Sequence, residues 1–365
     1  MKTQIQKNEL DLEKVKEIQT ALIAWYEKNH RDLPWRKNKN PYFIWISEIM
    51  LQQTRVETVI PYFLKFIQRF PDVRALAESD EEEVLKAWEG LGYYSRAVYL
   101  HRGAKMIMDR YGGKIPERVT ELKKIPGIGS YTAGAILSIA YNQPVPAVDG
   151  NVMRVFSRIF EIPDDIAQTE TKRKMESLGK IVISQENPSH FNQGLMDLGA
   201  MICTPLSPKC DICPLQCLCG AYRSGKQQQL PVKGKKKPVK EIKMEVGIVQ
   251  AGNKILLVKR PAEGILANLW ALPIKEKQAD LQEGQSILSE LKENYGIEIL
   301  NFRFLFRKKH VFTHQTWLMS VYRLEIGEQV QLKDLEMDWV TWKEVERYPC
   351  PAAFLKVIKE AQEIL

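Results

Sequence analysis

The chain has 365 residues, of which 44% are hydrophobic and 27% are charged, and its formal net charge is +8. This composition is that of a soluble globular protein, the length predicts two domains, and the positive charge favours a polyanionic partner. The N-terminal segment has no apolar core and no run reaches the length of a membrane span. We therefore expect neither a signal peptide nor an anchor, and predict a cytoplasmic protein.

Residues 1–225 carry apolar side chains at helical spacing and predict an all-α domain. Residues 12–29 predict one helix, residues 41–71 predict two more that we expect to be broken at Pro61, and others follow over 80–91 and 96–112. Residues 226–243 contain seven lysines and two prolines without an apolar period. This stretch predicts an extended basic linker, either lying near phosphates or simply solvated.

Residues 244–365 predict an α+β domain, because short strand patterns replace the helical spacing. A hairpin is expected around Ala251-Gly252, and a second pair of strands around the loop 310–314, HVFTH. The expected strands are residues 244–250, 253–260, 301–309 and 316–324, and the expected helices are residues 286–296 and 351–364.

Residues 122–155 predict a helix end, a glycine turn, a second helix, a proline-rich loop and a third helix. In such a turn the backbone amides of Gly127, Gly129 and Ser130 can form an anion site suited to a DNA phosphate. Asp149 precedes the third helix. Taken singly, the glycines also fit a plain tight turn, and Asp149 fits a helix N-cap.

Glu48 lies in an otherwise apolar helical stretch, YFIWISEIMLQQTR. Burial there would favour the protonated carboxyl, which is the state of a general acid, unless the helix turns Glu48 to solvent. Asp149, at a helix N-terminus, would instead be favoured as the anion. Two carboxyl groups with opposite preferences are the pattern expected for cleavage of a glycosidic bond.

A family resemblance rests on four segments, SEIMLQQTRVETVIPYF, WEGLGYYSRA, PGIGSYTAGAI and AVDGNVMR. They resemble the adenine DNA glycosylases of the MutY type, within the superfamily that carries a helix–hairpin–helix, a Gly/Pro-rich loop and an aspartate. The resemblance implies that Glu48 protonates a purine ring nitrogen and that Asp149 stabilises or briefly traps the cationic sugar. It further implies that Asn151 helps to hold the carboxyls and water, and that Tyr131 lies over the sugar.

The same resemblance implies a base pocket and a DNA-binding surface. The base pocket would contain Arg31, Trp35 and Gln193. Because a glycosylase must take its base out of the stack, a wedge is needed to fill the gap. The DNA contacts implied are the wedge residues Gln53 and Tyr93, together with Thr54, Gly127, Gly129 and Ser130.

Tyr131 stands where the related endonuclease III type carries a lysine, which forms a Schiff base and nicks the strand. A tyrosine offers no amine, so we expect base removal without efficient strand cleavage. The alternatives are a bifunctional, endonuclease III-like glycosylase/lyase for oxidised pyrimidines, a non-catalytic helix–hairpin–helix DNA-binding protein, and a Nudix hydrolase with a DNA-binding extension.

Five of the six cysteines fall between residues 203 and 219, and in a chain without an export signal this clustering favours a metal centre over disulfides. The spacing C-x6-C-x2-C-x5-C suits zinc or a 4Fe–4S cluster, although zinc ribbons usually offer two C-x2-C pairs. The resemblance implies an iron–sulfur cluster, structural or for DNA docking, held by Cys203, Cys210, Cys213 and Cys219.

The second domain resembles a Nudix fold with an eroded catalytic box. Glu290 and Glu293 remain, but Ser289 replaces the arginine and Asn294 a glutamate, so too few oxygen ligands are left for a magnesium site. The resemblance implies a recognition module that reads 8-oxoguanine opposite adenine, through Phe312, Thr313 and His314.

The expected partner is double-stranded DNA with 8-oxoguanine:adenine or guanine:adenine mispairs. We expect a monomer without membrane attachment, associated with the nucleoid.

Overall fold

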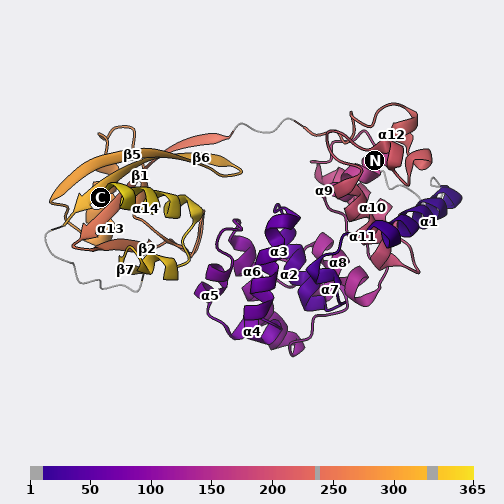
Figure 1. The fold of residues 1–365 in the computed structure, drawn as a ribbon, viewed down its shortest axis with the longest axis horizontal. Coiled ribbons are helices and arrows are strands. Elements are labelled where there is room, and N and C mark those ends of the chain that lie inside the picture. The colour runs from indigo at the N-terminus through magenta and orange to yellow at the C-terminus, as the bar shows by residue number, and fades with distance from the viewer. Residues whose placement is uncertain (1–10, 235–238, 327–335) are drawn as a thin grey trace. The chain divides into compact units, whose positions relative to one another are not determined.

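The computed structural model describes residues 11–234, 239–326 and 336–365. The chain divides into two compact units, Met1–Glu78 with Tyr99–Lys235, and Ser79–Val98 with Lys236–Leu365. The first unit is helical, and the second contains the strands (Figure 1). The expected fold class, an all-α domain followed by an α+β domain, is confirmed. Nothing in the sequence predicted that residues 79–98 group with the second unit.

A large apolar core cluster in the helical unit is built from buried side chains of the helices over Leu12–Asn29, Gly150–Ile159, Thr169–Val182 and Pro188–Met201. A second group of fully buried aromatic side chains includes Trp45, Phe63 and Phe66. The elements are α1 (Leu12–Asn29), η2 (Pro34–Arg36), α2 (Pro41–Leu51), α3 (Val56–Arg69), α4 (Val73–Glu78), α6 (Ser95–Tyr111), α7 (Val119–Leu122), α8 (Ser130–Tyr141), α9 (Gly150–Ile159), α10 (Thr169–Val182), α11 (Pro188–Met201), η3 (Cys210–Ile212), η4 (Gln216–Leu218) and α12 (Gly220–Arg223).

The expected helix break at Pro61 is wrong, because Pro61 lies inside α3. The chain instead leaves α2 at Gln52, and Gln53 takes a left-handed backbone conformation with φ 59°. Pro61 removes one backbone hydrogen bond from α3, but the helix buries Phe63 and Phe66 completely. Burial of two aromatic side chains outweighs the loss of one hydrogen bond.

The glycine turn and the loop before Asp149 are brought together by close backbone packing. Gly127 adopts φ 81°, a left-handed conformation that favours glycine, and Gly129 caps α8. A Cβ atom on Gly134, in the next turn of α8, would lie 2.1 Å from the carbonyl oxygen of Pro146. Only glycine allows this approach, which holds the loop leading to Asp149 against α8.

The second unit is built on a mixed sheet with the strand order β3-β2-β1-β6-β5, in which β4 also pairs with β1 and β7 with β2. β1 and β6 are parallel, and the other pairings are antiparallel. β1 begins inside the stretch predicted as a linker. The strands are β1 (Lys240–Ala251), β2 (Lys254–Lys259), β3 (Trp270–Ala271), β4 (Ile274–Glu276), β5 (Asn301–Val311), β6 (Gln315–Glu325) and β7 (Met337–Thr341).

Helices cover both faces of this sheet. The helix α14 (Ala352–Ile364) packs Phe354 and Val357 into the cluster that contains Ile248 of β1. The helix α13 (Gln285–Tyr295) packs Ile287 into the cluster that contains Val249. Because successive strand residues point to opposite faces, these helices lie on opposite sides of the sheet.

The unit also contains α5 (Glu81–Ala87) and the 3₁₀ turn η5 (Glu344–Arg347). Among the described residues, no helix has the length and apolarity needed to cross a bilayer.

Candidate active site

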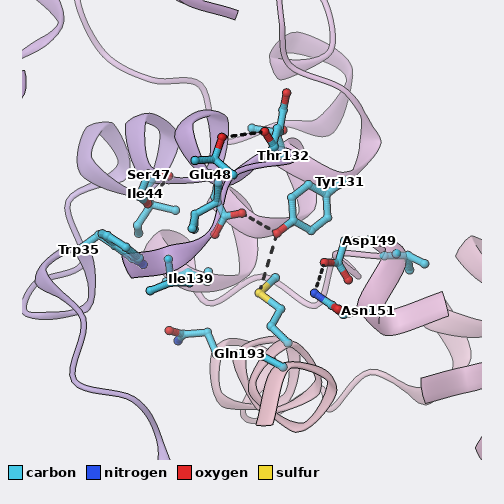
Figure 2. Close-up of a pocket in the computed structure, with 18 of the residues that line it drawn as sticks. Trp35, Ile44, Ser47, Glu48, Tyr131, Thr132, Ile139, Asp149, Asn151 and Gln193 are labelled. Carbon is cyan, nitrogen blue, oxygen red and sulfur yellow. Dashed lines mark hydrogen bonds between the residues drawn. The ribbon is translucent and has the colours of Figure 1, made fainter. Parts of the chain in front are cut away.

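A pocket of about 780 Å³ opens in the helical unit. It gathers side chains from the turn before α2, from α2 itself, from the glycine turn, from the start of α9 and from α11 (Figure 2). The residues predicted for catalysis and for the base pocket line this one pocket, as do all the predicted DNA contacts except Tyr93: Arg31, Trp35, Glu48, Gln53, Thr54, Gly127, Gly129, Ser130, Tyr131, Asp149, Asn151 and Gln193.

Glu48 is buried at the wall of this pocket, with 4% of its surface exposed. The hydroxyl of Tyr131 donates a hydrogen bond of 2.5 Å to its Oε2 atom, as Figure 2 shows. Burial raises the pKa of Glu48 to about 7, with the hydrogen bond from Tyr131 opposing the rise and the nearby Asp149 adding to it. The structure thus excludes the alternative in which α2 turns Glu48 to solvent.

Asp149 is the N-cap of α9, and its carboxylate is held from both oxygens. Its Oδ1 accepts from the backbone N–H of Val152 at 2.7 Å, and its Oδ2 accepts from the side-chain amide of Asn151 at 3.0 Å. Arg154 in turn donates to the Asn151 side-chain oxygen at 2.9 Å. Asp149 is therefore the N-cap of α9 as well as the carboxyl predicted to act in catalysis.

The predicted opposite preference of the two carboxyls is wrong as to direction. Burial raises the pKa of Asp149 as well, and the hydrogen bonds from Val152 and Asn151 oppose this only in part. The helix N-terminus alone would have favoured the anion, but desolvation in the pocket outweighs it. The contrast that remains is one of support. Asp149 accepts hydrogen bonds from the backbone N–H of Val152 and the side-chain amide of Asn151, whereas Glu48 accepts one from the Tyr131 hydroxyl.

Arg31 and Arg36 in the pocket lining are both held by Asp197, which sequence reasoning missed. Its side chain is fully buried, and it accepts from Arg31 Nε at 2.8 Å and from Arg36 Nη1 at 2.7 Å. Burial alone would raise the pKa of Asp197, but the hydrogen bonds and charges of Arg36 and Arg31 lower it. Arg31 therefore presents a fixed guanidinium at the pocket. An acid placed one helical turn after Gln193 was the signal available in the sequence.

The four patterned cysteines lie in a loop of two 3₁₀ turns outside the pocket. Burial raises the pKa of Cys213 to about 12, and the thiols of Cys203, Cys210 and Cys219 add to that rise, so the four sulfurs are close enough to interact. The buried Arg158 donates to Cys203 Sγ at 3.2 Å. Across the described residues, no three His, Cys, Asp or Glu side chains are grouped tightly enough for a single metal ion.

Tyr93 and the loop HVFTH lie in the second unit. Tyr93 has a left-handed backbone with φ 49°, and its hydroxyl hydrogen-bonds that of Thr313. Thr313 and His314 are exposed, whereas Phe312 is half-buried and packs edge-to-face on Trp317, with ring centroids 4.8 Å apart. Phe312 therefore anchors the loop, and Thr313 and His314 form its accessible tip.

Comparison with known proteins assigns both parts of the chain. Residues 46–180 match the family of HhH-GPD superfamily base excision DNA repair proteins, and residues 245–360 match the NUDIX domain. The helical fold and its carboxyl-lined pocket thus define a base excision DNA repair protein of that superfamily.

The match to full-length relatives is more specific. The chain is 32% identical over 404 residues to the adenine DNA glycosylase of Mus musculus, covering 96% of this chain and 78% of the relative. Against the adenine DNA glycosylase of Homo sapiens it is also 32% identical, over 96% of this chain and 75% of the relative. The chain belongs to the adenine DNA glycosylase family, as the resemblance implied.

Solved structures agree on the helical fold. A thermostable thymine-DNA glycosylase matches with 28% identity and a TM-score of 0.52, covering 58% of this chain and 98% of that one. A trapped endonuclease III–DNA covalent intermediate matches with 24% identity and a TM-score of 0.51, over 59% of this chain and 99% of that one.

Proposed function

We propose that this protein is a monofunctional DNA glycosylase that removes adenine mispaired with 8-oxoguanine or guanine in base excision repair. The observation that carries the proposal is the buried Glu48–Tyr131 pair in a pocket that also contains Asp149. A carboxyl with a pKa of about 7 is about half protonated at neutral pH, which suits a general acid. The membership of the chain in the adenine DNA glycosylase family supplies the substrate class.

In the proposed reaction the proton of Glu48 passes to a purine ring nitrogen. Because the Tyr131 hydroxyl donates to Oε2, we assign the transferred proton to Oε1. The bond between N9 and C1′ then breaks, its electron pair leaves with adenine, and positive charge develops on the sugar. The Asp149 carboxylate stabilises this charge, either electrostatically or through a short-lived bond to C1′. Water adds to C1′, and its proton passes to a carboxylate of the pair.

The proposed reaction ends at base removal. Strand cleavage through a Schiff base needs an amine at the sugar, and Tyr131 stands at the position where a lysine would supply one. The pocket lining holds Arg31 and Arg36 as its cationic side chains, and both are engaged by Asp197. A guanidinium is protonated at all working pH values and so is no nucleophile.

We propose that Thr313 and His314 read the base opposite adenine, with Tyr93 and Gln53 filling the gap left by the extruded nucleotide. 8-Oxoguanine differs from guanine by an oxygen at C8 and a hydrogen on N7. A hydroxyl such as that of Thr313 can accept a hydrogen bond from N7–H, which guanine cannot donate. The left-handed backbone of Gln53 and of Tyr93 supports this role, because strained conformations tend to mark functional positions.

Two further features support DNA binding. The first amides of α8 have no side-chain cap, so they can take a phosphate oxygen at a positive helix end. We also propose that Cys203, Cys210, Cys213 and Cys219 hold a 4Fe–4S cluster, since each thiol lies within electrostatic range of the others. The cluster would fix the loop that contains η3 and η4 and orient it for DNA docking, without taking part in base removal.

The experiment that tests the function uses labelled duplexes with adenine opposite 8-oxoguanine, guanine or thymine. Base loss is scored by strand breakage before and after alkali. We expect cleavage opposite 8-oxoguanine and guanine that becomes visible only after alkali. Strand breakage without alkali would instead favour the bifunctional glycosylase/lyase.

A further inference from the structure

The helix α5 is docked on the C-terminal sheet through its carboxylates, although it lies between two helices of the catalytic unit in the sequence. Glu82 Oε1 accepts from Lys259 Nζ at 2.6 Å and from the indole N–H of Trp270 at 3.1 Å. Glu81 Oε1 accepts from the side-chain amide of Asn268 at 2.7 Å. Two adjacent glutamates therefore contact the end of β2, the start of β3 and the loop before β3.

A second set of contacts lies just beyond the other end of α5. Glu89 Oε1 accepts from the backbone N–H of Cys350 at 3.0 Å. Lys86 Nζ bridges to Glu89 Oε2 at 2.6 Å and to the backbone carbonyl of Tyr348 at 3.1 Å. We call Glu81, Glu82, Lys86 and Glu89 together the α5 latch.

The latch is more than a set of exposed ion pairs, because its carboxylates accept hydrogen bonds from the indole N–H of Trp270 and the backbone N–H of Cys350, which belong to buried residues. Trp270 is 5% exposed and packs in the main core cluster, and Cys350 is fully buried there. The ion pair of Lys259 and Glu82 is partly exposed, with 27% of the Lys259 side chain and 43% of the Glu82 side chain accessible to solvent. A single pair of this exposure contributes little, but the indole and amide bonds add direction and make the docking specific.

The docked helix leads directly into the loop that carries Tyr93. The indole N–H of Trp88 donates to the Gly92 carbonyl at 3.2 Å, and Arg96 Nη2 donates to the same carbonyl at 3.0 Å. The Arg96 guanidinium also lies over the Tyr93 ring, 5.3 Å from its centroid. The loop is thus held from both sides, and at its tip the Tyr93 hydroxyl bonds the Thr313 hydroxyl.

We propose that the α5 latch is a positioning device for lesion recognition. It fixes residues 79–98 on the C-terminal sheet, so that the hydroxyls of Tyr93 and Thr313 form one composite reader of the base opposite adenine. Residues 79–98 continue covalently into α4 and α6, so the latch ties this reader to the chain of the catalytic unit. The inference rests on the proposed reading of 8-oxoguanine and names the residues that make it precise.

The test exchanges the charges of one latch pair in the full-length protein. Glu82→Lys and Lys259→Glu each place two like charges together, and the double variant restores opposite charges. Glu78→Lys, at the exposed end of α4, makes the same charge change on a residue paired with Arg74 and is the matched control. Two measurements follow each variant.

The first measurement is amide hydrogen exchange of the peptide containing Cys350 in the DNA-free protein. That amide is bonded to Glu89, at the opposite end of the latch from the substitutions. We expect exchange about threefold to fivefold faster in each single variant, since the lost attraction of a partly exposed ion pair is worth up to about 1 kcal/mol. The double variant should recover much of the protection, and Glu78→Lys should match the wild type.

The second measurement is the single-turnover preference for adenine opposite 8-oxoguanine over adenine opposite guanine. We expect the preference to fall about threefold to fivefold in each single variant, with the guanine rate within about twofold of wild type, and to recover in part in the double variant.

Unchanged exchange in both single variants would show that the latch does not hold in solution. Faster exchange with an unchanged preference would leave docking without a positioning role, and an equal fall of both rates would indicate general damage. Each of these results overturns the proposal. If the wild-type protein showed no preference for adenine opposite 8-oxoguanine, the proposed lesion reading and the positioning role would both be wrong. The exchange measurement would still show whether α5 is docked on the sheet.

Discussion

Glu48→Gln separates the catalytic from the structural consequences of a buried carboxyl. The change keeps the size of the side chain and a hydrogen-bond acceptor for Tyr131, but it removes the acidic proton. Loss of a general acid costs about two to four orders of magnitude, so adenine release should nearly cease while duplex binding persists. In the wild type, the single-turnover rate should fall about tenfold per pH unit above about 7, as Glu48 loses its proton.

The same substitution should stabilise the protein at alkaline pH. In the folded protein the pKa of Glu48 is about 7, above its ordinary value of 4.5. The protonated carboxyl therefore contributes to the free energy of unfolding in full below pH 4.5, and this contribution is lost as the pH rises through 7. This rise in the pKa of Glu48 corresponds to roughly 3 kcal/mol or less of the free energy of unfolding, because each pKa unit is worth about 1.4 kcal/mol. Glutamine has no charge to bury and escapes the loss.

Thermal unfolding at pH 5 and pH 8 measures this effect. The melting temperature of Glu48→Gln relative to wild type should rise by a few degrees between the two pH values. Glu57→Gln, an exposed substitution on α3, is the control and should show no such change. Near-normal adenine release by Glu48→Gln would refute the assignment of the general acid, and a pH-independent difference in melting temperature would refute the burial argument.

Three other outcomes follow from the site. Tyr131→Lys should gain some trapping by borohydride through a Schiff base, whereas the wild type should show almost none; strong trapping of the wild type would contradict the monofunctional reaction. The purified protein should be brown with about four iron atoms per chain, and Cys213→Ser should lose them while Cys217→Ser keeps them; stoichiometric zinc after anaerobic purification would defeat the cluster. Thr313→Ala should lower the preference for 8-oxoguanine over guanine by roughly fivefold or more, as measured by single-turnover rates, and an unchanged ratio would place lesion reading elsewhere.

The pocket was predictable because its residues sit at points where the sequence breaks its own pattern. Glu48 is an acid inside an apolar helix, and Gly127 and Gly129 interrupt helical spacing. The strands around Ala251-Gly252 and around HVFTH were predictable from alternation and turn residues, and β1, β2, β5 and β6 have these positions. Local pattern was sufficient because each of these features is specified by residues close together in the chain.

What could not be predicted depends on partners distant in sequence. Asp197 meets Arg31 across 166 residues, and Glu82 meets Lys259 across 177. The local sequence predicts that a charged residue on a helix is exposed to solvent, because its partner lies in a distant segment. Neither pair could therefore be predicted from the residues around it. The error at Pro61 has the same origin. The rule that proline ends a helix considers only neighbouring residues, and it takes no account of the burial of one face of α3.

Glu48 and Asp149 differ in the hydrogen bonds that each carboxylate accepts. Burial raises the pKa of both carboxyls, so their difference must come from the groups that hold each anion. Asp149 accepts from the backbone N–H of Val152 and from the Asn151 side-chain amide, whereas Glu48 accepts from the Tyr131 hydroxyl. The charge of Asp149 in turn raises the pKa of Glu48. In the proposed reaction, the anion that faces the cationic sugar is therefore also one reason that its neighbour keeps the proton that the leaving base requires.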